Sequence, residues 1–310
     1  MHYALHYDYD VKLKITFLGT SASKPTTDRN LSCVCIEIEN NVLMFDAGEG
    51  TQIAYLKSGL KWNKKMKLFI THLHGDHCLG ILGLLQTMSI QQRTKPIEIY
   101  GPDGIVDFIV NNMKILNFNL EFPVFINTID EHSIINEKTY KIYCCQAQHS
   151  IDAFSFLLEE VTKYGKFSPE LAMFFHVPKG NMWKEIQDGN NVRIDGKIIK
   201  PSDIISIKKK NKKIGISGDT RPTKKLEKFF QGCDCLIFDS TFLHAHKHKA
   251  LKTYHTTSYE AAQLAKNAHV LKLILTHFST RYTKDDVFIQ DAKKIYDEVI
   301  CAKDFQEINM

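Results

Sequence analysis

The segment FITHLHGDHCLGILGLL, residues 69–85, places His72, His74, Asp76 and His77 within six consecutive positions. An apolar, strand-like run precedes these side chains, and a helix-like run rich in leucine and glycine follows them. Three imidazoles and a carboxylate crowded at a strand–helix junction either bind a common ligand or compete for the same water. The rest of the sequence decides between these two interpretations.

The composition is that of a soluble globular protein with ample material for a buried core. The chain has 310 residues, of which 44% are hydrophobic and 24% are charged. No apolar run reaches the roughly 18 to 20 residues of a membrane span, and the N-terminus lacks the apolar core of a signal peptide. We therefore expect a cytoplasmic protein without a membrane segment. The net charge of +5 is compatible with an anionic partner but does not require one.

The eight cysteines favour free thiols over disulfides, because a chain of this size without a secretory signal is expected in a reducing compartment. Cys33 and Cys35 alternate along a strand-like run, and so do Cys233 and Cys235, as buried small hydrophobic residues do. Neither pair has the CxxC spacing of a zinc knuckle. We expect structural cysteines rather than metal ligands.

Strand-like and helix-like segments alternate in both halves of the chain. The strand-like segments are 11–20, 32–39, 41–48, 67–72, 97–102, 140–150, 154–161, 212–219, 235–242 and 272–277. The helix-like segments are 51–60, 77–88, 104–116, 224–232, 258–268 and 285–300, and Thr257 with Glu260 forms a capping-box pattern. From about 161 to 201, glycines and prolines interrupt short mixed segments, which is typical of an insertion. This order predicts an α/β sandwich with helices outside two sheets.

Four of the predicted strands end in a side chain that can bind a metal ion. These residues are His72, His149, Asp219 and His277. With His74, Asp76 and His77 they make five imidazoles and two carboxylates, a mixture that suits zinc or another borderline divalent metal. Seven ligands are too many for one four-coordinate zinc, so two ions that share one carboxylate account for them. A single histidine of this kind would more often be a packed or surface residue, and only the cluster favours metal binding.

The run His72-Leu73-His74-Gly75-Asp76-His77 resembles the HxHxDH signature of the metallo-β-lactamase superfamily. Further segments resemble the short form of ribonuclease Z, the tRNA 3′-processing endonuclease. They are FLGTSASKPTTDRN (17–30), FDAGEGTQ (45–52), IYGPDG (99–104), SGDTRP (217–222), HTTSYEAAQLAK (255–266) and LILTHFSTRY (273–282). The resemblance covers nearly the whole chain. It implies a single domain over 1–310, a four-layered αββα sandwich, with the insertion at about 161–201 as a flexible tRNA-binding arm.

The resemblance also implies a division of the ligands between two zinc ions per subunit, although other divalent metals are possible. His72, His74, His149 and Asp219 would hold one ion. Asp76, His77, His277 and the shared Asp219 would hold the other. Asp76 would also accept the proton of the attacking water. Two neighbouring metal ions can activate a water molecule and stabilise negative charge on a phosphodiester.

The leaving oxygen must also be protonated. In ribonuclease Z, a histidine from an H-S-T motif is thought to supply this proton and a glutamate from an H-E-A-T motif to orient it. His255 in HTTS resembles the first residue, and Asp239 in FDSTF takes the place of the glutamate with one methylene fewer. The alternative for His255 is a histidine that merely flanks a helix start. His244, His246 and His248 are expected to be exposed rather than metal-bound.

Two other segments resemble substrate-binding elements of the same family. Pro25, Arg29 and Asn30 match a P-x-K-x-R-N loop associated with the acceptor end of tRNA, with Thr27 in place of its lysine. In the arm, Lys163, Lys166 and Lys179 are expected to contact phosphates. Gly180-Asn181 stands where a Gly-Pro element is usual. The arm aromatics, Phe167, Phe174, Phe175 and Trp183, either pack the arm or stack on RNA, and packing is the more common use.

The resulting hypothesis is a zinc-dependent endoribonuclease that cleaves tRNA precursors 3′ of the acceptor stem. It leaves a 3′-hydroxyl on the tRNA and a 5′-phosphate on the trailer. The alternative is a phosphodiesterase of the same superfamily that acts on small diesters or other RNAs. A non-catalytic RNA-binding scaffold is disfavoured because all seven ligands are present. The resemblance further implies a homodimer in which the arm of one subunit serves the cleft of the other.

Overall fold

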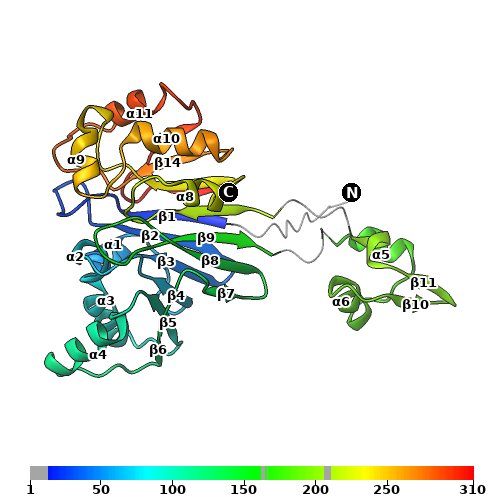
Figure 1. The fold of residues 1–310 in the computed structure, drawn as a ribbon. Coiled ribbons are helices and arrows are strands. Elements are labelled where there is room, and N and C mark those ends of the chain that lie inside the picture. The colour runs from blue at the N-terminus through cyan, green and yellow to red at the C-terminus, as the bar shows by residue number, and fades with distance from the viewer. Residues whose placement is uncertain (1–12, 162–164, 166, 206–210) are drawn as a thin grey trace. The chain divides into compact units, whose positions relative to one another are not determined.

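The computed structural model describes residues 13–161, 165, 167–205 and 211–310. The chain divides into two compact units. Of the described residues, the larger unit comprises 13–135, 142–158 and 213–310, and the smaller comprises 136–141, 159–161, 165, 167–205 and 211–212. Figure 1 shows the elements of both units, which are described in turn below.

The first seven-stranded sheet has the order β16-β1-β2-β3-β4-β5-β6. Its strands are β1 (Leu13–Gly19), β2 (Cys33–Ile38), β3 (Asn41–Phe45), β4 (Lys65–Phe69), β5 (Ile97–Gly101), β6 (Val124–Thr128) and β16 (Glu307–Asn309). The pairs from β16 to β3 are antiparallel, whereas those from β3 to β6 are parallel. The parallel half therefore brings the carboxyl ends of β3, β4 and β5 to one edge.

The outer face of this sheet is covered by α1 (Thr51–Lys57), α3 (Gly80–Ile90) and α4 (Ile105–Ile115), and the short α2 (Gly75–Cys78) precedes α3. Leu84, Leu85 and Met88 of α3 are fully or almost fully buried in the core beneath these helices. At the start of α3, a Cβ atom on Gly80 would lie 2.0 Å from the carbonyl oxygen of Gly48. Glycine therefore allows α3 to approach the loop after β3.

The second seven-stranded sheet has the order β15-β14-β13-β12-β9-β8-β7. Its strands are β7 (Ile134–Asn136), β8 (Tyr140–Gln146), β9 (Phe154–Glu160), β12 (Lys213–Ile216), β13 (Cys235–Asp239), β14 (Leu273–Thr276) and β15 (Val299–Cys301). The four strands from β12 to β15 are parallel. The helices α8 (Lys224–Phe229), α10 (Ser258–Asn267) and α11 (Asp286–Ala292) pack on this half, and η1 (His244–His246) and α9 (Lys247–Lys252) lie between β13 and α10 in the chain.

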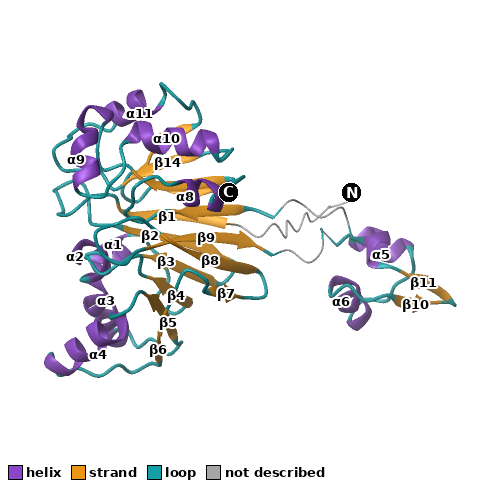
Figure 2. Cartoon of the chain, in the orientation of Figure 1, coloured by secondary structure: helices purple, strands orange, loops and turns teal. Residues whose placement is uncertain are grey.

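The two sheets face each other through a core rich in aromatic side chains. Phe45 of β3 and Phe69 of β4 contact Phe156 of β9, with ring centroids 5.7 and 5.5 Å apart. All three rings are at most 1% exposed. Figure 2 shows helices on the outside of both sheets of the larger unit. The predicted αββα sandwich is therefore confirmed.

The smaller unit has a hydrophobic core of its own. It contains α5 (Pro169–Phe174), α6 (Asn181–Gln187), the hairpin β10 (Val192–Ile194) and β11 (Lys197–Ile199), and α7 (Pro201–Ile204). Phe167, Phe175 and Trp183 pack against this core, as the sequence favoured. Phe174, by contrast, is 73% exposed.

One predicted element is wrong at its end. The helix expected over residues 285–300 stops at Ala292, and Val299–Cys301 form β15 instead. Val299 pairs with Leu273 of β14 and is buried, so sheet pairing decides the conformation of this segment. The helical spacing of apolar residues in the sequence carries no information about such a non-local pairing partner.

Candidate metal centre

The potential ligands gather where strands of the two sheets end. His72 follows β4, His149 follows β8, Asp219 follows β12 and His277 follows β14. His277 adopts a positive φ of 61°, a conformation that is costly for a residue with a Cβ atom. All these residues belong to the larger unit. A strained backbone at a strand end, held by its neighbours, is characteristic of a functional site.

Three histidines form the first group, which contains His72, His74 and His149. The Nδ1 atom of His74 lies 3.0 Å from Nε2 of His72 and 3.1 Å from Nε2 of His149. Three ring nitrogens therefore converge on a single point. Such an arrangement suits a cation, because each neutral imidazole can direct one lone pair at it.

The second group contains Asp76, His77, Asp219 and His277. The Nε2 atom of His277 lies 3.4 Å from Oδ2 of Asp76 and 3.3 Å from Oδ1 of Asp219. Asp219 Oδ2 lies 3.2 Å from Nε2 of His77 and 3.7 Å from Nε2 of His72. Asp219 thus stands between the two groups, within reach of a ligand position in each.

Four of the five histidines in the two groups direct their second ring nitrogen at an oxygen outside the cluster. The contacts are His72 Nδ1 with Thr71 Oγ1 at 2.9 Å, His77 Nδ1 with Asp46 Oδ2 at 2.7 Å, His149 Nδ1 with the Tyr254 carbonyl at 3.2 Å, and His277 Nδ1 with Thr241 Oγ1 at 2.9 Å. An imidazole that donates its N–H outward keeps a lone pair on the nitrogen that faces inward. This pattern of supporting contacts is the one that metal-binding histidines show.

The electrostatics of the site also fit a bound cation. Asp46, Asp219 and Asp239 are all at most 5% exposed and carry negative charge into the interior. Burial alone would lower the pKa of His77, but the carboxylates of Asp219 and Asp46 raise this pKa well above its usual value. The protein therefore offers a negative environment that favours positive charge at this position. The donor set and its surroundings fit one or more divalent metal ions.

His255 and Asp239 form a dyad beside these groups. The Nδ1 atom of His255 lies 2.9 Å from Oδ2 of Asp239, so the aspartate reaches the histidine despite its shorter side chain. Burial would lower the pKa of His255, but the charges of Asp239 and Asp219 outweigh burial and raise this pKa to about 9. The structure thus brings together a protonated imidazole and the carboxylate that orients it.

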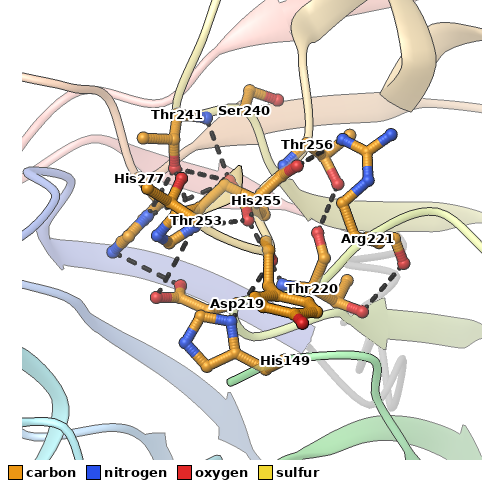
Figure 3. A network of polar contacts seen from close by, with 12 residues as sticks. His149, Asp219, Thr220, Arg221, Ser240, Thr241, Thr253, His255, Thr256 and His277 are labelled. Atoms are coloured by element: carbon orange, nitrogen blue, oxygen red, sulfur yellow. Dashed lines mark hydrogen bonds and ion pairs between the residues drawn. The ribbon is translucent and has the colours of Figure 1, made fainter. Parts of the chain in front are cut away.

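A second polar network holds the His255 segment in place, as Figure 3 shows. The guanidinium group of Arg221 donates to the backbone carbonyl of His255. It also donates to both carboxylate oxygens of Glu260, at 3.0 and 2.5 Å. Thr256 donates its hydroxyl to the carbonyl of Thr220 at 2.5 Å. The residues after Asp219 are thereby joined to the residues that carry His255.

The predicted loop at residues 23–30 lies against the site, but two of its side chains are bound within the protein. Arg29 donates to Asp285 Oδ1 at 2.5 Å, and Asn30 donates through Nδ2 to the Leu18 carbonyl at 2.9 Å. Pro25 is exposed. The backbone N–H of Ser23 donates to Oδ2 of Asp76 at 2.7 Å. The loop therefore contacts a potential metal ligand directly.

The other predicted residues lie elsewhere. Lys163 and Lys166 are outside the described residues. In the smaller unit, the Nζ of Lys179 lies 5.7 Å from the ring centroid of Trp183. Gly180 has φ 114° and ψ −133°, a conformation restricted to glycine. Asn181 follows as the first residue of α6, a position that also accepts proline.

The histidines of the HAHKHK segment are not part of the potential metal groups found in the described residues. His244 lies against the ring of Tyr259, at 4.3 Å between centroids, and His246 Nδ1 lies 2.6 Å from the hydroxyl of Tyr282. Sequence reasoning assigned no role to Asp46, Thr71 or Thr241. Asp46 had a detectable signal, since it follows β3 just as the potential ligands follow their strands.

Comparisons with known proteins agree with this fold. A family model described as Anti-Pycsar protein Apyc1 matches residues 13–296. Ribonuclease Z of Nitrosopumilus maritimus is 56% identical over 298 residues, which cover 96% of this chain and 100% of that protein. Ribonuclease Z of Methanosarcina acetivorans is 36% identical, with 96% of this chain and 98% of that protein covered.

Comparisons with solved structures also agree with this fold. Human tRNase Z, short form, superposes with a TM-score of 0.68 at 29% identity, covering 95% of this chain and 98% of that one. The metallo-β-lactamase fold protein YhfI of Bacillus subtilis superposes with a TM-score of 0.70 at 16% identity, covering 97% of this chain and 100% of that one. At this low identity, the similarity to YhfI supports the fold alone.

The fold and the clustered imidazole and carboxylate groups define a hydrolase with the metallo-β-lactamase fold. The Apyc1 model spans most of the chain, so the chain belongs to the family that it describes. By its full-length relatives, the chain belongs to the ribonuclease Z family, and it is a hydrolytic endoribonuclease.

Proposed function

We propose that this chain is a zinc-dependent endoribonuclease that cleaves precursor tRNA at the 3′ side of the acceptor stem. The tRNA would keep a 3′-hydroxyl, and the trailer would carry a 5′-phosphate. The observation that carries this proposal is the His255–Asp239 dyad, at 2.9 Å, beside the two groups of potential metal ligands. The names of the relatives, ribonuclease Z and tRNase Z, support tRNA as the substrate.

We further propose two zinc ions per subunit. The first would be held by His72, His74, His149 and Asp219, and the second by Asp76, His77, His277 and the shared Asp219. The groups of converging nitrogens and carboxylate oxygens support this division. When bound, the ions would lower the pKa of a water molecule and stabilise negative charge on the phosphodiester.

The chain's own residues would move the protons of the reaction. Asp76 would accept a proton from the attacking water, whose oxygen bonds to phosphorus. His255 would donate its Nε2 proton to the ribose 3′-oxygen as the bond from phosphorus to that oxygen breaks. Asp239 would orient His255 and stabilise its positive charge through the contact with Nδ1. Proton acceptor and donor would thus be separate groups.

Substrate binding would involve the loop at 23–30 and the insertion at about 161–201. We propose this insertion as a tRNA-binding arm in a domain spanning 1–310. Lys163, Lys166, Lys179 and Gly180 are the proposed arm residues. In the loop, Pro25 is exposed, whereas Arg29 and Asn30 are bound to Asp285 and Leu18. A phosphate at Arg29 would therefore compete with Asp285, so the main role that we propose for Arg29 and Asn30 is to shape the loop.

We propose a cytoplasmic homodimer. Ile53 and Leu56 of α1 and Ile90 of α3 are 54%, 50% and 79% exposed, and α1 packs beside α3. Burial of these side chains between two copies would remove an apolar surface from water. No helix among the described residues is long and apolar enough to span a membrane.

The alternative is a phosphodiesterase that acts on small diesters or other RNAs without the arm. Removal of the arm separates the two functions. Because the Glu160 N–H donates to the Lys212 carbonyl at 2.9 Å, residues 162–210 can be replaced by a short Gly/Ser turn. We expect this variant to keep its zinc and its hydrolysis of bis(p-nitrophenyl)phosphate but to lose cleavage of precursor tRNA by at least about tenfold.

Asp76→Ala is the control for this experiment, and it should abolish both reactions. Mapping of the product ends, with and without a CCA sequence on the precursor, would identify the cleavage position. Unchanged tRNA cleavage after arm removal would contradict the role of the arm. Hydrolysis of the small diester by the complete chain, without cleavage of precursor tRNA, would favour the alternative.

A further inference from the structure

We propose that Thr241 is a positioning residue that joins the second metal group to the histidine of the leaving-group dyad. The proposal rests on the proposed function in one respect, namely that His255 protonates the leaving oxygen. Thr241 lies two residues beyond the last residue of β13 and is 3% exposed. Its hydroxyl oxygen lies 2.7 Å from Asp239 Oδ1, 2.9 Å from His277 Nδ1 and 3.2 Å from His255 Nδ1.

The hydrogen-bonding capacity of a hydroxyl assigns the protons in this cluster. A threonine hydroxyl has one hydrogen to donate and two lone pairs with which to accept. The hydrogen goes to Asp239 Oδ1, since a buried carboxylate only accepts and this contact is the shortest. A lone pair is then available for the Nδ1–H of His277. With its hydrogen on Nδ1, a neutral His277 has its lone pair on Nε2, the atom that faces Asp76 and Asp219.

The same hydroxyl helps to hold one oxygen of Asp239, so that the other oxygen faces His255. Asp239 Oδ1 is held by both the backbone N–H and the hydroxyl of Thr241, at 2.9 and 2.7 Å. The other oxygen, Oδ2, lies 2.9 Å from His255 Nδ1. Thr241 therefore contributes to fixing the rotation of the carboxylate that orients His255. The backbone N–H groups of Thr220 and Thr256 also hold this carboxylate, since they donate to Oδ2 at 3.2 and 3.3 Å. Figure 3 shows Thr241 between His277 and His255.

A second threonine provides a natural comparison. Thr71 donates its hydroxyl to Asp46 Oδ2 at 2.9 Å and lies 2.9 Å from Nδ1 of His72, while Asp46 also binds His77. Each sheet thus supplies one Thr–Asp pair that orients two histidines. The pair Thr71–Asp46 serves two potential metal ligands. The pair Thr241–Asp239 serves one potential ligand and one proton donor, and this difference is what the experiment measures.

The experiment compares Thr241→Val with Thr71→Val, since valine keeps the shape of threonine but removes its hydroxyl. Zinc binding to each apoprotein is measured by calorimetry and by metal analysis. We expect both variants to bind zinc about 10- to 100-fold more weakly at one of the two positions. Thr241→Ser, which keeps the hydroxyl, should bind zinc nearly as the unmodified chain does.

Activity at saturating zinc then separates the two threonines. Precursor tRNA releases a ribose alkoxide, which must be protonated, whereas bis(p-nitrophenyl)phosphate releases a stabilised phenolate that leaves without a proton. For Thr241→Val we expect kcat to remain at least about tenfold low on precursor tRNA and to recover on the nitrophenyl diester. For Thr71→Val we expect kcat to recover equally on both substrates.

Three outcomes would overturn the proposal. The first is a Thr241→Val variant with unchanged zinc affinity. The second is a kcat of Thr241→Val that recovers equally on both substrates at saturating zinc. The third is a Thr241→Ser variant as impaired as Thr241→Val, which would show that altered packing, not the lost hydroxyl, causes the defect. Should Thr241→Val fail to fold, as judged by circular dichroism, Thr241→Ala takes its place. A complete chain that binds zinc but does not cut precursor tRNA would refute the proposed substrate, and the zinc affinities would still decide the role of Thr241.

Discussion

At the scale of single residues, Asp46 supports the potential ligands from outside the two ligand groups. Its carboxylate accepts hydrogen bonds from the Thr71 backbone and hydroxyl, at 2.7 and 2.9 Å, and lies 2.7 Å from His77 Nδ1. Asp46 also has a positive φ of 61°. Asp46 thus adopts a costly backbone conformation and orients two histidines. We infer that this conformation serves the potential ligands rather than strand β3, which precedes it.

We therefore predict that Asp46→Asn weakens zinc binding about 10- to 100-fold, because the amide removes an oxygen acceptor and the negative charge beside His77. Titration of the apoprotein with zinc would measure this loss. Asp304→Asn is a matched control, since Asp304 is a part-buried carboxylate that accepts from Thr20 Oγ1 and the Asn30 backbone at 2.8 and 2.6 Å. Equal zinc affinities of the two variants would argue against an orienting role for Asp46.

At the scale of elements, α10 shows how a local signal in the sequence also serves the site. The capping box predicted from Thr257 and Glu260 is present, with the Thr257 hydroxyl accepting from the Glu260 N–H at 3.2 Å. Glu260 additionally binds Arg221, whose guanidinium group holds the carbonyl of His255. The helix start therefore fixes the segment that carries the dyad histidine.

The pH dependence of stability tests this arrangement. Burial would raise the pKa of Glu260, but the hydrogen bond and charge of Arg221 outweigh burial and lower this pKa. A carboxyl with a lowered folded-state pKa stabilises the protein above its unfolded pKa, about 4.3, and this contribution is lost as pH falls through the folded-state value. We predict that Glu260→Gln lowers the free energy of unfolding by about 1 to 3 kcal/mol at pH 7 and by less at pH 3.

Urea unfolding of the apoproteins at several pH values would measure this difference. Glu227→Gln is the control, because Glu227 pairs with Lys224 at the surface of α8 and should change stability by less than about 0.5 kcal/mol. A difference between Glu260→Gln and the unmodified chain that stays constant down to pH 3 would contradict the prediction.

At the scale of the whole molecule, the potential ligands come from both sheets of the larger unit. His72 and His77 belong to the half that contains β4, and Asp219 and His277 follow β12 and β14 in the other sheet. An ion bound by these residues would link the two sheets in the folded state, and the unfolded chain has no such preformed site. Metal binding should therefore stabilise the fold.

We predict that removal of zinc by a chelator lowers the Tm, and that zinc at 100 times its Kd restores about 2.7 kcal/mol of stability. Calorimetric melting with and without zinc would measure the shift. Asp219→Ala, which removes the residue between the two groups, should melt at nearly the same temperature in both conditions. A zinc-independent Tm of the unmodified chain would be inconsistent with a site that joins the sheets.

Much of the fold and of the site could be predicted from the sequence, because the relevant signals are local. Strand-end ligands, the capping box at Thr257 and the HxHxDH run are all visible within short windows. The exceptions depend on contacts between residues that are far apart in the sequence. The end of α11 and the strand Val299–Cys301 depend on pairing with β14, and the resemblance alone did not establish that Asp239 reaches His255.

The sequence by itself determined the alternation of elements and the ligand types, since backbone propensity and side-chain chemistry are properties of neighbouring residues. Only the tertiary structure decided how those ligands are oriented. Asp46 and His77 are 31 positions apart, and Thr241 and His277 are 36 apart. Their contacts exist because the ends of different strands meet at one edge of the sandwich. Hydrogen bonds across such separations depend on packing of the sheets, which no short stretch of sequence contains.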